Sequence, residues 1–330
     1  MKQRFKRAAL PFGVLALLLL SCLLALRLGS TYLDTPSFLG GLFRRAGFET
    51  QSVILYSIRL PRMLAGVFAG AGLALSGSLL QRVSDNALAA PSILGINAGA
   101  GFFVILALTL APRAFALLPV AAFCGALLAA LLILGIASRL GLDRTAVVLS
   151  GVALSALFSA GISFFSVLDA DVLSSYTDFS VGGLRGVTMR ELYIPIPIIL
   201  MCYLLALLLA RRLKLFCLGD TLAASLGVSV RRVRLTALML AAASAAAAVS
   251  FAGLLGFVGL LVPHVTRRLV KHSTETELLL SPLCGAILLL LADLAGRLLF
   301  APTEIPVGIF TALLGVPFFL SLLIRRKHDA

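Results

Sequence analysis

The chain is built from apolar stretches of about 20 residues, the length at which a helix crosses the hydrocarbon core of a bilayer. Ten of them recur along its 330 residues, and we expect helical spans at roughly 9–28, 61–80, 93–111, 115–137, 145–167, 193–211, 234–252, 254–270, 278–298 and 306–324. Only 13% of the residues are charged, against about 25% in average soluble domains. Because lipid offers the backbone no hydrogen-bond partners, helices are the expected form. The sequence predicts an all-α, polytopic membrane protein with one domain over residues 1–330.

The first apolar stretch follows four basic residues, Lys2, Arg4, Lys6 and Arg7, and has two interpretations. One is a signal peptide that is removed after export. The apolar run, however, exceeds the about 7–15 residues usual in such peptides, and no A-x-A-like cleavage site follows it. We therefore expect a first span that is retained in the protein.

Positive charges predict the orientation, because Lys and Arg near the ends of spans are held on the cytoplasmic side. With a cytoplasmic N-terminus, 19 of the 28 basic residues fall in inner segments. The even number of spans returns the C-terminus to the same side, so both termini are expected in the cytoplasm. Topology also accounts for most of the net charge of +14, and nucleic acid is not an expected partner.

Residues that would give the chain chemistry of its own are missing from the sequence. None of its five lysines follows glycine or precedes Ser or Thr, as a phosphate-binding P-loop requires. The three histidines and five cysteines are dispersed, without the spacing of a metal site or a disulfide framework. We therefore expect no enzyme activity and no metal or cofactor bound by this chain.

One carboxylate, Asp293, lies well inside a predicted span, and Arg297 follows it one helical turn later. Residues four apart share a face of a helix, so a structural ion pair is the simpler interpretation. The alternative is an ion relay, which would suit a secondary carrier driven by an ion gradient. The scarcity of carboxylates inside the spans disfavours that class of transporter.

Small residues recur at the spacing of close helix packing. Gly66 and Gly70 form one GxxxG pattern, Gly95 and Gly99 form another, and residues 241–248 are nearly all alanine. In lipid, helices associate closely where small side chains let their backbones approach. The pattern therefore predicts a compact bundle.

Three arginines at the predicted outer ends of spans run against the positive-inside pattern. Arg59 and Arg62 lie at the mouth of the second span, and Arg297 reaches the same surface near the end of the ninth. They either extend to lipid headgroups or form a fixed cationic patch that receives carboxylates of a soluble partner.

A short amphipathic segment, residues 218–228, lies between two spans on the predicted inner side. Six basic residues flank it, namely Arg211, Arg212, Lys214, Arg231, Arg232 and Arg234. In a protein this apolar, such a segment is where a soluble partner would hold the chain.

Motifs from about residue 59 to the C-terminus carry a family resemblance. In the first half they are Arg59-Leu-Pro-Arg62, Ala71-Gly-Leu-Ala-Leu-Ser-Gly77, Leu80-Gln81, Asn86-Ala-Leu-Ala and Ile93-Leu-Gly-Ile96 with Gly99-Ala100. In the second half they are Leu218-Gly-Asp220, Ser225-Leu-Gly-Val228, Gly256-Phe-Val-Gly-Leu-Leu-Val-Pro-His264 with Arg267, Ala292-Asp293 with Arg297, and Glu304-Ile-Pro-Val-Gly308 with Leu314-Gly315. Together, in order and spacing, they resemble the iron-chelate and vitamin B12 permeases of ABC importers, the FecCD type.

The resemblance implies a ten-helix subunit of the type II ABC importer architecture in a bacterial inner membrane. The implied partners are a second permease subunit, with a homodimer favoured over a paralogue, two cytoplasmic ATPase subunits that bind ATP and Mg, and an extracytoplasmic substrate-binding protein. The implied function is transport of a metal chelate, with ferric siderophore the leading substrate and heme and cobalamin as alternatives. A membrane scaffold without substrate flux is a third class, beside the permease and the secondary carrier.

The resemblance also implies roles for particular residues. Arg59, Arg62 and Arg297 would receive acidic residues of the binding protein. Coupling to the ATPase would fall within about 214–232, at Leu218, Gly219, Asp220, Ala223, Leu226 and Gly227. The gate and pathway would involve Asn86 and Leu88 after the second span, and Thr145 and Ser150 at the start of the fifth. Alanine replaces the family's usual proline at position 87, which predicts a less rigid gate loop.

Overall fold

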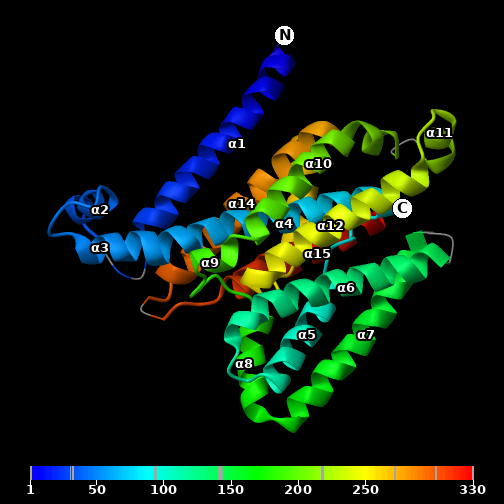
Figure 1. Ribbon diagram of the computed structural model, residues 1–330. Coiled ribbons are helices and arrows are strands. Elements are labelled where there is room, and N and C mark those ends of the chain that lie inside the picture. Colours follow the sequence, from blue (N-terminus) through cyan, green and yellow to red (C-terminus); the bar gives the residue numbers. More distant parts are fainter. Residues whose placement is uncertain are drawn as a thin grey trace.

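The computed structural model describes residues 2–29, 31, 33–92, 95–139, 144–216, 219–270, 273–301 and 303–328, and these are helical with short connections. The elements are α1 (Lys2–Arg27), α2 (Thr35–Leu42), α3 (Glu49–Val53), the π-helical η1 (Ile54–Arg59), α4 (Leu60–Ser84), α5 (Ile96–Leu110), the 3₁₀ turn η2 (Phe115–Leu117), α6 (Leu118–Arg139), α7 (Arg144–Leu168), α8 (Ala170–Val181), α9 (Met189–Leu192), α10 (Pro195–Leu215), α11 (Asp220–Ser225), α12 (Val230–Ala252), α13 (Val258–Leu269), α14 (Thr274–Leu298) and α15 (Val307–His328). Figure 1 shows a helical bundle with α2 and α3 at one end and α11 at the other. We call these the α2 end and the α11 end.

Each of the ten predicted spans coincides with a helix of the structure. Seven helical stretches in the described part of the chain are long and apolar enough to cross a bilayer. Helices α5 and α13, with 15 and 12 residues, are shorter than that, and in α15 the described apolar stretch is Val307–Ser321. The prediction of an all-α polytopic membrane protein is confirmed, and the spans predicted at α5 and α13 are shorter than a full crossing.

The second span is longer than predicted, and several short helices were missed. One continuous helical stretch of 36 residues runs from Glu49 to Ser84, although the apolar pattern begins only at residue 61. Its first turns carry Glu49, Thr50, Gln51 and Ser52, which a hydropathy argument reads as a loop. Helix α8 was missed for a similar reason, since polar residues begin it: Asp169 is its N-cap, and the Asp169 side chain accepts hydrogen bonds from the amides of Asp171 and Val172.

Helices α4, α12 and α14 form the centre of the bundle. In the most apolar 18 residues of each span, 72%, 78% and 67% of the residues are buried, against 11% for α1 and 22% for α7. Helix α1 stands at the edge of the bundle in Figure 1. The alanines of residues 241–248 lie in the buried part of α12, so the predicted role of small side chains in a compact bundle fits this centre.

Glycines bring the backbones of neighbouring helices into direct contact. A Cβ atom on Gly70 of α4 would overlap the carbonyl group of Gly285 in α14, and a Cβ on Gly77 would overlap that of Gly259 in α13. Gly99 packs in the same way against Gly125 of α6. Of the predicted GxxxG residues, Gly95 instead precedes α5 with φ +78°, where its backbone starts the helix.

Candidate functional site

A cluster of buried charges joins α4 to α14 at the α2 end. Arg62 Nη2 lies 2.9 Å from Asp293 Oδ1, and Arg62 Nη1 lies 2.7 Å from Glu304 Oε2. Asp293 Oδ2 is in turn 3.0 Å from Arg297 Nε, the i,i+4 contact that the sequence spacing predicts. Because that Nε makes no directed hydrogen bond, the second contact is mainly a charge contact. One carboxylate thus binds guanidinium groups of two helices.

The other two predicted docking arginines hold the end of α1. Arg59 donates to the carbonyls of Leu26, Arg27 and Thr31 at 2.8, 2.6 and 2.5 Å. Arg297 donates to the carbonyls of Ala25 and Leu28 at 3.4 and 3.2 Å. The last carbonyls of a helix have no partners within it and favour positive charge, so these two guanidinium groups cap α1.

Their contacts therefore separate the three arginines that the sequence groups together. Arg59 and Arg297 are each 4% exposed and face the end of α1. Arg62 is 9% exposed and, unlike the other two, borders a cleft. The sequence identified where these cations lie along their helices, but it gave no information about the direction in which each one points.

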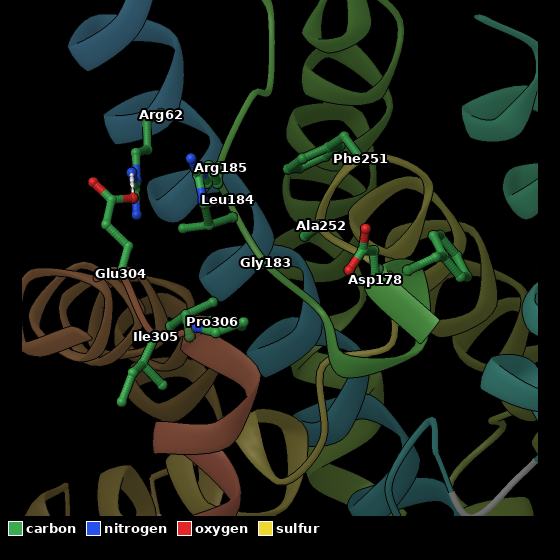
Figure 2. Close-up of a pocket in the computed structure, with 13 residues that line it drawn as sticks. Arg62, Asp178, Gly183, Leu184, Arg185, Phe251, Ala252, Glu304, Ile305 and Pro306 are labelled. Carbon is green, nitrogen blue, oxygen red and sulfur yellow. Dashed lines mark hydrogen bonds and ion pairs between the residues drawn. The ribbon is translucent and has the colours of Figure 1, made fainter. Parts of the chain in front are cut away.

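The cleft beside Arg62 opens at the α2 end and has a volume of about 440 Å³. Its charged lining residues are Arg62, Asp178, Arg185 and Glu304, and atoms of Phe179, Gly183, Leu184, 251–253 and 305–307 complete it. Figure 2 shows the side chains of Arg62 and Glu304 pointing toward each other, with Asp178 on the far side of the cleft. Arg185 and Asp178 are exposed, so both signs of charge reach solvent here.

Backbone hydrogen bonds tie together the segments that form the cleft. Gly183 N donates to Ala252 O at 3.0 Å, and Gly308 N donates to Gly182 O at 3.2 Å. Leu254 N donates to Phe179 O at 3.2 Å. The ends of α8 and α12 and the start of α15 therefore meet at one junction beside the cleft.

The predicted coupling segment forms a short helix, α11, at the opposite end of the bundle. Gly227 N donates to Ala224 O at 3.0 Å and Val228 N donates to Ala223 O at 3.1 Å, the two bonds of a Schellman motif. Gly227 has φ +82°, which L side chains rarely adopt. Leu218 lies outside the described residues, as does the side chain of Asp220.

Helix α11 presents an apolar surface between basic residues, as the sequence predicts. Leu222 and Leu226, one turn apart, are 56% and 60% exposed, while Ala223 is fully buried against the bundle. Gly219 precedes the helix with φ +91°. Five of the six flanking basic residues are exposed, namely Arg211, Arg212, Lys214, Arg231 and Arg232, whereas Arg234 is buried with its guanidinium carbon 5.7 Å from the Phe216 ring.

The predicted gate residues lie on two different elements. Asn86 Oδ1 accepts a hydrogen bond from Leu88 N at 3.0 Å, and Ala89 N donates to Asn86 O at 3.0 Å. These bonds order a tight turn after α4 although proline is missing at position 87. Thr145 and Ser150 lie in the first two turns of α7, where Thr145 is exposed and Ser150 is 6% exposed.

A second buried charge cluster, at the α11 end, was missed by the sequence reasoning. Glu277 of α14 is fully buried and its carboxylate binds Arg82 of α4 and Arg267 of α13. Arg267 Nη2 is 3.1 Å from Glu277 Oε1 and 3.3 Å from Gln81 Oε1, and Arg82 Nη1 donates to Thr274 Oγ1 at 2.8 Å. Glu277 therefore fastens three helices together directly beside the predicted gate loop.

The two clusters are separated by about the thickness of a bilayer core. Arg62 and Arg82 lie 20 residues apart on α4, which is about 30 Å at the helical rise per residue. The hydrocarbon core is also about 30 Å thick. This spacing fits a placement of the two clusters at the two edges of the hydrocarbon, where charges are less costly than at its centre.

Comparisons with known proteins agree with this arrangement. Residues 17–325 match the FecCD transport family. The chain is 35% identical over 96% of both chains to the Fe(3+)-citrate import system permease protein YfmE of Bacillus subtilis. It is 40% identical to the cobalamin import system permease protein BtuC of Halobacterium salinarum, over 86% of this chain and 76% of that one.

A solved structure has the same fold over nearly its whole length. It is an inward-facing conformation of a metal-chelate type ABC transporter, and it superposes with a TM-score of 0.87 over 96% of this chain and 99% of that chain, at 29% identity. The chain therefore belongs to the FecCD transport family, the permease subunits of ABC importers for metal chelates.

Proposed function

We propose that this chain forms the translocation pathway for a ferric siderophore, as one of two permease subunits that two ATPase subunits drive. The observation that carries the proposal is the exposed Leu222 and Leu226 surface of α11 within a basic surround. Such a surface suits a soluble partner, and the chain has no P-loop of its own. The α11 end and both termini would then face the cytoplasm, in line with the distribution of basic residues.

The choice of substrate rests on family membership. A relative that imports Fe(3+)-citrate supports an iron chelate, and a cobalamin permease at 40% identity supports cobalamin as the second candidate. In an importer of this kind the binding protein selects the ligand. Identifying the ligand that co-purifies with the binding protein of this system would decide between the two, and a cobalamin would overturn the siderophore proposal.

We expect ATP-driven uptake that depends on Gly227. Replacing Gly227 with Leu in the permease reconstituted with its ATPase and binding protein should leave insertion intact, because no atom lies within 4 Å of an added Cβ. At φ +82° the new side chain strains the end of α11, so chelate uptake should fall toward the level without ATP while ATP hydrolysis continues. Radiolabelled chelate uptake and phosphate release measure the two activities in the same vesicles.

The matched control is Gly47→Leu. Gly47 also has a positive φ, +85°, and also has open space around its Cβ position, but it lies at the α2 end. This variant should transport normally. Uptake by Gly227→Leu equal to that of the parent protein would contradict the coupling role. Uptake that needs a proton gradient instead of ATP would identify a secondary carrier and contradict the function as a whole.

For docking of the binding protein we propose the cleft, with Arg62 as the arginine that faces it. Arg59 and Arg297 cap α1, so their contribution to docking would be to hold the cluster in place. An acidic side chain entering the cleft would meet Arg62 and the exposed Arg185. Glu304 already binds Arg62 at 2.7 Å, so such a side chain would share or exchange this partner.

Arg185→Glu tests the docking cleft without breaking buried contacts, because Arg185 is exposed. We expect the affinity for the binding protein to fall several-fold at low salt and the difference to shrink as salt screens the charges. Surface plasmon resonance at two ionic strengths measures the affinity of each variant for the binding protein. Arg113→Glu is the control, since Arg113 is exposed in the turn between α5 and η2, outside the cleft. Equal affinities of Arg185→Glu and the parent protein at low salt would exclude this cleft.

A further inference from the structure

A small helical hairpin at the α2 end remains unexplained by transport. It consists of α2, the turn 43–48 and α3, and we call it the α2–α3 hairpin. Its inner side is closely packed, since Gly40 lies against the Phe48 ring and Ser52 Oγ donates to Gly41 O at 2.7 Å. Tyr56 Oη also donates to Leu42 O at 2.8 Å. The hairpin is therefore a defined element with a fixed outer face.

That outer face is apolar, although it points away from the protein. Pro36, Leu39 and Phe43 follow one another at three and four residues and so share one side of α2. Pro36 is exposed, Leu39 is 43% exposed and Phe43 is 66% exposed. Val53 at the end of α3 is 58% exposed as well. An exposed apolar face of this kind marks a surface that contacts a protein or a membrane.

Two arginines stand directly at the end of this face. Arg44 and Arg45 follow Phe43 and both are exposed. The Arg44 guanidinium carbon lies 4.4 Å from the centre of the Tyr56 ring, and the backbone of Arg44 is left-handed with φ +50°. The turn therefore places two cations and a tyrosine beside an apolar face, the composition of a helix that lies in a membrane interface.

The position of the hairpin favours the membrane as the cover. It follows α1, which is the least buried of the candidate spans at 11% and exposes apolar side chains such as Leu19 and Leu23. Arg27 at the end of α1 donates to Thr35 Oγ1 at 3.0 Å, which fastens the hairpin to this lipid-facing helix. Figure 1 shows α2 and α3 beyond the end of α1, at the edge of the bundle.

We propose that the α2–α3 hairpin is a lipid-binding element, with Leu39 and Phe43 in the boundary between headgroups and acyl chains and with Arg44 and Arg45 on the phosphates of anionic phospholipids. The apolar face supplies depth and the arginines supply preference for negative charge. The proposal concerns the surface of the permease and does not depend on which substrate it carries.

The chain contains no tryptophan, so a single introduced indole reports on its own surroundings. Phe43→Trp in the full-length protein, reconstituted in vesicles of acyl-chain-brominated lipid, should show blue-shifted emission and lose most of it to bromine quenching. Leu23→Trp on the exposed face of α1 is the positive control, and Leu226→Trp on α11 is the control for a water-exposed indole. Emission of Phe43→Trp like that of Leu226→Trp, without quenching, would overturn the proposal.

The arginines are tested in the same protein with brominated phosphatidylglycerol diluted into plain phosphatidylcholine. Quenching of Phe43→Trp should exceed that by brominated phosphatidylcholine at equal dilution, because each arginine near an anionic surface favours binding about fivefold. Adding Arg44→Gln and Arg45→Gln should remove the difference. Equal quenching by both lipids before that change would overturn the headgroup assignment. An unquenched indole that responds only to added binding protein would show that a protein covers this face instead.

Discussion

Gly70→Ala is expected to lower the melting temperature of the purified permease sharply, or to prevent recovery of a folded protein. The added Cβ would overlap the backbone carbonyl of Gly285 and approach the amide of Ala286. Overpacking a core commonly costs about 1–3 kcal/mol, and here the obstacle is backbone, so α4 and α14 must move apart as whole helices. Thermal unfolding in detergent, followed by the loss of monodisperse protein, measures the effect.

Two further glycines provide a graded control. At Gly66, on the same face of α4, a Cβ would lie 2.9 Å from Leu290 Cδ2, and the end of a leucine side chain can turn away. At Gly135 of α6 no atom lies within 4 Å, so alanine should be neutral or slightly stabilising through its helix propensity. From the most to the least stable variant, the expected order is Gly135→Ala, Gly66→Ala and Gly70→Ala. Equal melting temperatures for the three variants would contradict backbone contact between α4 and α14.

Glu277→Gln is expected to destabilise the α11 end by about 3–5 kcal/mol, the usual cost of removing one partner from a buried ion pair. Glutamine keeps the size of the side chain and one acceptor oxygen, but it removes the negative charge that Arg82 and Arg267 share. Both arginines would then remain in an environment of low polarity without this carboxylate. The melting temperature of the permease, and its sensitivity to protease cleavage between α13 and α14, report the change.

Glu275→Gln is the matched control for this experiment. Glu275 lies in the same first turn of α14 but is exposed, so the same chemical change should alter stability by a few tenths of a kcal/mol. If Glu277→Gln and Glu275→Gln unfolded at the same temperature, the Glu277 cluster would not fasten the three helices. High salt should leave the difference largely intact, because buried charges are little screened.

The positions of the helices were predictable because lipid makes a local demand on the sequence. Every 20-residue crossing must be apolar within itself, so the ten spans could be located without knowing the tertiary structure. The short helices at the α2 end escaped the same argument. Helices α3 and α8 begin with polar residues and lie next to membrane spans, where composition alone reads as a loop.

The candidate site was predictable only where its parts are close in sequence. Asp293 and Arg297 are four residues apart, and helical geometry predicts their contact. The bonds of Arg62 to Asp293 and of Arg82 to Glu277 join residues 231 and 195 positions apart, which no local pattern indicates. The sequence carried one signal for Glu277. This acidic residue lies at the start of its helix, on the side of the membrane where the helices of Arg82 and Arg267 end. The role of Arg59 as a cap for α1 left no such signal.

Helix α4 carries one charge cluster near each of its ends, and between Arg62 and Arg82 it is an unbroken α-helix. A rod of this kind has no joint at which a movement could be absorbed. We expect a partner that displaces the Arg62 end also to displace the Arg82 end and the Asn86 turn that follows it. The helix would then pivot about the tight backbone contacts of Gly70 and Gly77 near its middle. A movement at one face of the membrane would in this way reach the other face.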